Sequence, residues 1–139
     1  MVPPLKKKRK ILLVDNDQRS SYIICLILKL NGYDIEYYTD PESMLSQLEN
    51  SAYDLILLSL SSAKTNYFEL YNQIRNRDAH VSICFMMDDN SLHNNYYNDD
   101  NFAQPFKGDL NSCEFVDKPV NTNDLLEIVK SHLEQQHES

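Results

Sequence analysis

Glycine, tryptophan and paired cysteines are scarce or absent in this chain of 139 residues. The two glycines lie far apart, which excludes a glycine-rich phosphate-binding loop. The three cysteines, Cys25, Cys84 and Cys113, form no CxxC pair, which argues against a disulfide framework and for a reducing compartment. No apolar run approaches the roughly 20 residues that span a bilayer, and no apolar signal segment follows the first residues. We therefore expect a cytoplasmic protein with no membrane contact.

The charge is negative overall, but the cations cluster at one end. The 13 basic and 21 acidic residues give a formal net charge of -8, so the body of the protein should repel nucleic acid and anionic membranes. Residues 1–9 are expected to form a flexible basic leader. The run of cations that begins there resembles a short nuclear-import signal, although a solvated arm is the simpler interpretation. If nucleic acid binds at all, we expect it at Lys6, Lys7, Lys8, Arg9 and Lys10.

Short apolar runs alternate with amphipathic stretches from residue 10 to residue 135. The runs typical of strands are 11–14, 35–38, 55–58, 81–87 and 114–116. The stretches with helical spacing are 18–31, 41–48, 68–74 and 122–133. This alternation predicts one α/β domain built on a doubly wound parallel sheet, because each parallel crossover needs a covering helix.

The expected helices also carry end signals. Asp17, Asp40 and Asn121 can each cap a helix start, and Gly32 fits the left-handed position after the first helix.

Residues 88–111 interrupt the alternation. They are rich in Asn and Asp and carry aromatic residues without a period, which predicts a long polar loop in place of much of the fourth helix. Residues 136–139 are a short tail. The expected organisation is therefore a leader over 1–9, one domain over 10–135 and a tail.

Polar residues follow the expected strands at the edge where doubly wound sheets place their sites. Asp15 and Asn16 follow the first strand, Ser59 the third, and Lys118 the fifth. The segments ILLVDND, YDLILLS, ICFMM and FVDKP, in this order, resemble the receiver domain of two-component response regulators of the chemotaxis-regulator type. The resemblance covers roughly residues 10–135. It implies a (βα)5 sheet with the flavodoxin-like strand order 2-1-3-4-5 and a place in a phosphorelay.

The resemblance also implies a site, of which this chain keeps only part. Receivers use an Asp after the third strand as phosphoacceptor, two acids after the first strand as Mg²⁺ ligands, a hydroxyl residue after the fourth strand and a Lys after the fifth. Asp15 and Lys118 match this pattern. In contrast, Ser59 stands at the acceptor position, Asn16 at the second acid and Met87 at the hydroxyl residue.

These replacements predict a degenerate site. A serine hydroxyl is a weak nucleophile without an adjacent base, and Met87 cannot donate a hydrogen bond. Mg²⁺ binding at Asp15 and Asn16 should be weak or lost, so no cofactor is expected. We expect Asp15 and Lys118 to form an ion pair. Phe115 occupies the aromatic switch position.

The resulting hypothesis is a stand-alone pseudo-receiver, not an enzyme, that signals by binding a protein such as a kinase or effector. One alternative is residual phosphorylation of Ser59 or Asp15 with Mg²⁺. A second is an oligomerisation module, with a second copy of the chain held through the first helix. That helix is apolar nearly all round: Ile23, Ile24, Cys25, Leu26, Ile27, Leu28 and Leu30.

Other chemistry has little support in the sequence. The spacing of the four histidines matches no metal motif, so no histidine metal site is expected: His80, His93, His132 and His137. Cys25 and Cys84 lie in apolar periodic segments and should pack as small hydrophobic residues, whereas Cys113 is expected to be accessible.

Overall fold

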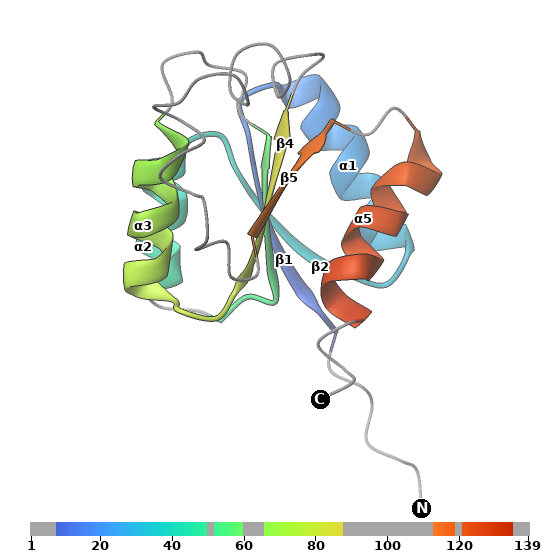
Figure 1. The fold of residues 1–139 in the computed structure, drawn as a ribbon. Helices are drawn as coiled ribbons and strands as arrows, with labels where there is room; N and C mark the ends of the chain where they lie inside the picture. Colours follow the sequence, from blue (N-terminus) through green and yellow to red (C-terminus); the bar gives the residue numbers. More distant parts are fainter. Residues whose placement is uncertain (1–7, 50–51, 60–65, 88–112, 119–120, 135–139) are drawn as a thin grey trace, which may run out of the picture.

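The computed structural model describes residues 8–49, 52–59, 66–87, 113–118 and 121–134. Its centre is a five-stranded parallel sheet in the order β2-β1-β3-β4-β5, as predicted. The strands are β1 (Lys10–Asp15), β2 (Asp34–Tyr38), β3 (Leu55–Ser59), β4 (Ser82–Met87) and β5 (Cys113–Asp117). The helices in the described ranges are α1 (Gln18–Leu30), α2 (Pro41–Leu48), α3 (Tyr67–Arg77) and α5 (Thr122–Glu134). Figure 1 shows three layers, with α2 and α3 on one face of the sheet and α1 and α5 on the other.

The capping residues set the helix ends where the sequence predicts them. The Asp17 carboxylate accepts the Arg19 N–H at the start of α1. After α1, Gly32 adopts a φ of +91°, a conformation that costs a side-chain-bearing residue free energy. The N–H groups of Gly32 and Tyr33 donate to the Lys29 and Leu28 carbonyls, and these two bonds close the helix in a Schellman motif.

The sheet is buried on both faces, so each strand contributes alternate residues to two cores. On β1, Leu12 and Val14 belong to the core under α2 and α3. Ile11 and Leu13 belong to the core under α1 and α5. All four side chains are fully buried. The continuous apolar run of β1 is therefore explained by burial on both sides.

The structure resolves which face of α1 packs. Ile24 and Leu28 are buried against the sheet. Ile23, Leu26 and Leu30 are 56%, 47% and 77% exposed, so these members of the apolar stripe point away from the core.

The expectation that Cys113 is accessible is wrong. It begins β5 and is only 8% exposed, because its side chain joins the core under α2 and α3.

Several expected segments lie outside the described residues. They are most of the basic leader (1–7), the long loop of 88–111 and the tail of 136–139. In the part of the chain that is described, no helix has the length and apolar character needed to cross a bilayer.

Candidate functional site

Two polar residues meet at the carboxyl edge of the sheet. Asp15 ends β1 and Ser59 ends β3, and the two are register partners on adjacent strands. Adjacent strands lie about 4.8 Å apart, so the two side chains are neighbours. Asp15 is fully buried and Ser59 is 2% exposed. The structure thus brings these two predicted site residues together in a region closed to solvent.

The Asp15 carboxylate is satisfied by its own loop and by α1. Oδ1 accepts the Asp17 N–H at 2.8 Å, and Oδ2 accepts the Ser20 hydroxyl at 2.6 Å. A buried carboxylate is costly unless it is hydrogen-bonded, and the amino-terminal end of a helix adds a favourable dipole. These contacts stabilise the buried Asp15 charge, and the expected ion pair with Lys118 stays a prediction.

This set of donors does not fit Mg²⁺. The ion prefers near-octahedral oxygen coordination that includes one or two carboxylates. Both oxygens of the buried carboxylate are already hydrogen-bonded, Asn16 is exposed and offers only a neutral amide, and Ser59 offers a hydroxyl. A divalent cation would have to displace the Ser20 hydroxyl from Asp15 to reach Oδ2.

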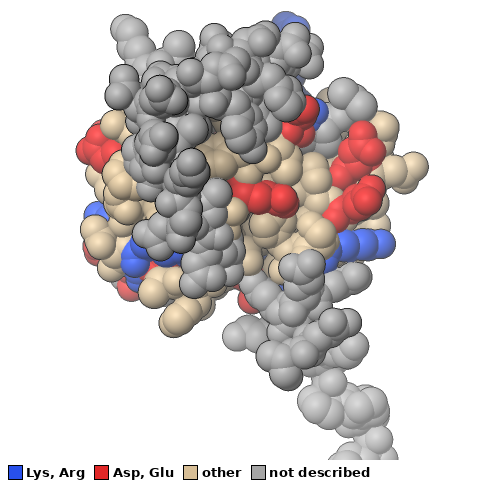
Figure 2. Space-filling view, viewed as in Figure 1, with Lys and Arg blue, Asp and Glu red and all other residues tan. Residues whose placement is uncertain are grey.

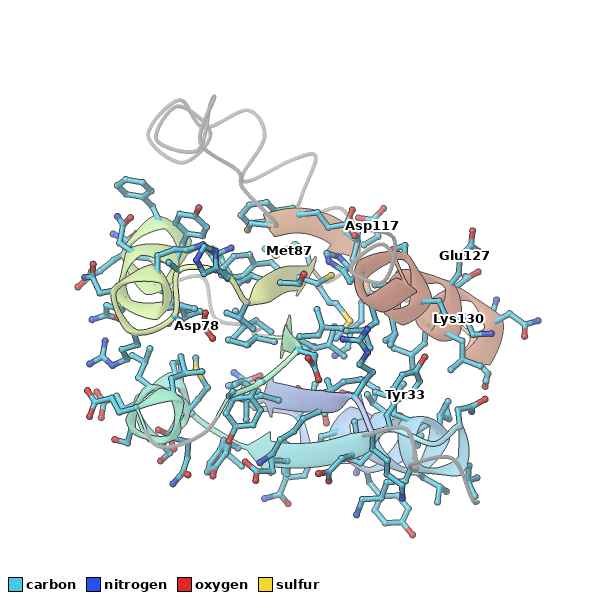
Figure 3. The ribbon with its side chains drawn as sticks, turned by 90° about the horizontal axis from the view of Figure 1, so that it is seen from below. Tyr33, Asp78, Met87, Asp117, Glu127 and Lys130 are labelled. Carbon is cyan, nitrogen blue, oxygen red and sulfur yellow. The ribbon has the colours of Figure 1, made fainter. Side chains whose placement is uncertain are left out.

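Met87 and Lys118 lie at the same edge on β4 and just after β5. The Lys118 N–H donates to the Met87 carbonyl at 2.6 Å, which fixes the backbone after β5 beside the end of β4. Met87 is 1% exposed and its side chain belongs to the core under α2 and α3. Figure 3 shows Met87 next to Asp117, its register partner on β5. The thioether supplies packing at this position and no hydrogen-bond donor.

Phe115 packs into a cluster of three aromatic rings. It stacks on Phe85 with ring centroids 4.7 Å apart and planes at 11°. Tyr67 meets it edge-on, with centroids 6.5 Å apart. Tyr67 is 1% exposed, so the cluster joins the core under α3. In this structure, the predicted switch residue is held against buried rings.

Sequence reasoning missed two partners of Asp15. Ser20 lies one turn into α1, and Tyr37 on β2 donates its hydroxyl to the Asp15 carbonyl at 2.9 Å. The position of Ser20 five residues after Asp15, next to a helix cap, is a weak signal that could have suggested the first contact. Nothing in the sequence indicates the second, because it depends on strand pairing.

Sequence reasoning also missed a cluster of metal-binding residue types. Cys84, Glu114 and His132 place one donor atom each within 4.8 Å of one another, away from the Asp15 edge. The interpretation of Cys84 as a buried core residue is confirmed.

An apolar surface on α1 adjoins the site. We call Tyr22, Ile23, Leu26 and Leu30 the α1 stripe, since all four are large, hydrophobic and exposed. A pocket between α1 and the start of α5 borders this stripe and reaches Lys118. The stripe is therefore continuous with the carboxyl edge of the sheet.

Comparisons with known proteins agree with this geometry. The family model for the response regulator receiver domain matches residues 11–130. "Response regulator ArlR" of Staphylococcus saprophyticus is 26% identical over 127 residues, which cover 91% of this chain and 53% of that protein. "Sensor protein EvgS" of Escherichia coli O157:H7 is 26% identical over 96% of this chain and 10% of that protein. This chain thus spans about half the length of the first relative and a small part of the second.

Solved structures show the same fold. A CheY-like response regulator receiver domain protein from Methanospirillum hungatei has a TM-score of 0.75 at 22% identity, covering 94% of this chain and 98% of that one. The chemotaxis response regulator CheY4 of Vibrio cholerae has a TM-score of 0.70 at 19% identity, covering 91% of this chain and 100% of that one. The predicted fold and the predicted family are confirmed. From its motifs, its strand order and the match over residues 11–130, this chain belongs to the response regulator receiver domain family.

Proposed function

We propose that this receiver domain is a pseudo-receiver that signals by protein binding without being phosphorylated. The observation that carries the proposal is the pair Asp15 and Ser59 at the carboxyl edge. The acceptor position holds a buried serine, and the remaining carboxylate is hydrogen-bonded to Ser20 and to its own loop.

The chemistry of phosphoryl transfer supports this proposal. Transfer needs an in-line nucleophile and neutralisation of the charge on the transferred group. A serine needs a base to accept its proton, and the neighbouring Asp15 already accepts two hydrogen bonds. Met87 offers no hydrogen bond to a phosphoryl oxygen. We therefore assign the chain no catalytic activity of its own. Its expected cytoplasmic location stays a prediction.

The packing of Phe115, at the aromatic switch position, also supports a fixed conformation. A switch that responds to phosphorylation needs a residue with two accessible positions. The stacking of Phe115 on Phe85, closed by Tyr67, favours one inward position. Aromatic pairs of this kind contribute about 1 kcal/mol beyond the area that they bury.

The α1 stripe is the surface that we assign to partner binding. The helix carries Arg19 and Lys29 and no acidic residue, in a chain whose net charge is -8. Exposed apolar patches with a charged rim mark interaction sites. The matching partner is a helical protein surface with apolar residues in the centre and acidic residues at the rim. The helical domains of sensor kinases are the first candidates within two-component systems.

Intact-mass spectrometry tests the first half of the proposal. The chain is incubated with acetyl phosphate and Mg²⁺ beside Ser59→Ala, with a receiver that retains its acceptor Asp as positive control. We expect no adduct on either form of this chain while the positive control is modified. An adduct that Ser59→Ala abolishes would show a phospho-accepting Ser59. An adduct that survives would point to Asp15. Either result would overturn the proposal.

A binding measurement tests the second half. Helical domains of the sensor kinases from the source organism are titrated with this chain by calorimetry, without a phosphoryl donor. Leu26→Lys should weaken binding tenfold or more, because a contact of about 1.4 kcal/mol is lost. Asn72→Lys adds the same charge on the exposed face of α3 and should leave the affinity unchanged. Equal affinities for Leu26→Lys and the parent chain would exclude the α1 stripe. Sedimentation velocity on the same variants detects the alternative occupant, a second copy of the chain.

A further inference from the structure

Three side chains with metal-binding chemistry meet between the sheet and α5. Cys84 on β4 and Glu114 on β5 are register partners, and His132 lies in the last turn of α5. Their donor atoms all lie within 4.8 Å of one another. Glu114 is the second residue of β5, whereas Lys118 follows the last. At about 3.3 Å per residue, the cluster lies roughly 13 Å from the carboxyl edge, so it is separate from the receiver site.

The donor set selects the class of metal. A thiolate, an imidazole and a carboxylate are the ligands of Zn²⁺, whereas Mg²⁺ and Ca²⁺ bind oxygen almost exclusively. Sites with three protein ligands leave a fourth tetrahedral position to water. Zinc bonds of 2.0–2.3 Å place tetrahedral donors about 3.3–3.8 Å apart. The His132 Nε2 and Glu114 Oε1 atoms are 2.6 Å apart, so a bound ion requires them to separate by roughly 1 Å.

The three side chains differ in solvent exposure, and a metal can enter or leave a site only where at least one ligand is exposed. Cys84 is fully buried, His132 is 10% exposed and Glu114 is 45% exposed. The site is thus closed toward the core and open on the carboxylate side.

An acidic groove leads to the open side. Glu114 is part of the lining of a pocket between β5 and α5 that also contains Asp117, Asp124 and Glu127. Figure 2 shows acidic side chains gathered on this face, over β5 and α5. Clustered carboxylates raise the local concentration of cations, and the pocket has room for the water that would complete the coordination. Lys118 also lines it, so the attraction is reduced but not reversed.

We propose that Cys84 Sγ, the Glu114 carboxylate and His132 Nε2 bind one Zn²⁺ ion, with water as the fourth ligand. On binding, the thiol proton goes to solvent and the single ring proton of His132 resides on Nδ1. The ion replaces the hydrogen bond between His132 and Glu114 with bonds from both to the metal.

The bound ion would join α5 to β4 and β5. Burial raises the pKa of the Cys84 thiol, so the metal-free protein keeps a neutral thiol in the apolar core. Zinc binding is therefore favoured as pH rises, because it releases that proton. By mass action, Zn²⁺ at 100 times its dissociation constant should raise the Tm by roughly 10 °C.

Cobalt substitution on the purified full chain tests the proposal. After chelator treatment, Co²⁺ is titrated and the sulfur-to-cobalt charge-transfer band is recorded, and Zn²⁺ is then added to displace it. We expect one Co²⁺ per chain, with a thiolate band that is absent in Cys84→Ala. In His132→Gln and in Glu114→Gln, the affinity for Co²⁺ should fall at least tenfold.

Matched variants separate this site from adventitious binding. Cys113→Ala removes a buried cysteine that faces the opposite core, and His80→Gln removes an exposed histidine; both should bind Co²⁺ like the parent chain. A band that persists in Cys84→Ala, or the absence of any thiolate band in the folded parent chain, would overturn the proposal. Circular dichroism establishes that each variant is folded. If Cys84→Ala is not, the two Gln variants decide the question, and unchanged affinity in both would refute the site.

Discussion

Removal of the Ser20 hydroxyl should destabilise the domain, because that hydroxyl compensates a buried charge. Ser20 donates to Asp15 Oδ2 at 2.6 Å, and Asp15 is fully buried. A hydrogen bond to a charged group contributes about 1.5–3 kcal/mol. Replacement by alanine regains roughly 0.5 kcal/mol of helix propensity. The net expectation for Ser20→Ala is a loss of about 1–2.5 kcal/mol in the free energy of unfolding.

The matching change in Tm follows from the size of the chain. At an unfolding entropy of about 2.1 cal/mol/K per residue, this domain loses roughly 3–9 °C in Tm for that change in free energy. Urea unfolding followed by circular dichroism measures it directly.

Ser46→Ala is the matched control for helix propensity. Ser46 lies on α2 and is exposed, and its hydroxyl donates to the backbone carbonyl of Glu42, so its replacement should be neutral or slightly stabilising. Ordinary surface substitutions change the free energy of unfolding by less than about 0.5 kcal/mol. If the free energies of unfolding of Ser20→Ala and Ser46→Ala differ by no more than that, the role assigned to the Ser20–Asp15 contact is refuted. In an Asp15→Ala background, the effect of Ser20→Ala should disappear.

Three further changes test the fold around the site. Leu28→Asp should prevent folding, since Leu28 is fully buried. Leu30 is 77% exposed, so Leu30→Asp should lower the free energy of unfolding by under about 0.5 kcal/mol. Equal losses of circular dichroism signal in the two variants would contradict the assigned face of α1. Gly32→Ala should cost about 1 kcal/mol in urea unfolding because of the φ of +91°, and a neutral result would argue against the left-handed turn. Burial raises the pKa of the Cys113 thiol from 9.0 to about 12. At pH values between these two, the unfolded chain binds fewer protons than the folded one, so the free energy of unfolding falls as pH rises. Cys113→Ala should lessen that decline by up to about 1.4 kcal/mol per pH unit, and identical slopes would contradict the burial of this thiol.

The fold could be predicted in detail because local signals agree with the global pattern. Asp17, Asp40 and Asn121 mark the starts of three helices, and each accepts the expected N–H group at its helix start. The apolar run of β1 indicates a strand buried on both faces, which a parallel sheet provides. The strand order came from the resemblance to receivers and not from the residues alone.

The interactions within the site could be predicted only in part. The strand ends identify Asp15 and Ser59 as neighbours, but the choice of Asp15 partner does not follow from residue types. Charge alone predicts an ion pair with Lys118, which stays a prediction. Ser20 is an observed partner that residue types do not indicate, because it depends on α1 presenting a hydroxyl to the carboxylate.

Two surface features required the three-dimensional structure. Periodicity cannot choose the buried face of α1, because the helix is apolar nearly all round, and only packing shows that Leu28 faces inward and Leu30 outward. The cluster of Cys84, Glu114 and His132 has no motif, since its members come from two strands and a helix. Pairing of β4 with β5 and packing of α5 bring them together.

The most direct test of the pseudo-receiver proposal is a titration of the isotopically labelled chain with Mg²⁺ and then acetyl phosphate, followed in amide proton–nitrogen correlation spectra. The account predicts no saturable shifts at Asn16, Ser59, Met87, Phe115 and Lys118. Saturable shifts at these amides, reversed when the phosphoryl donor is exhausted, would show a working phosphorylation switch and contradict the account.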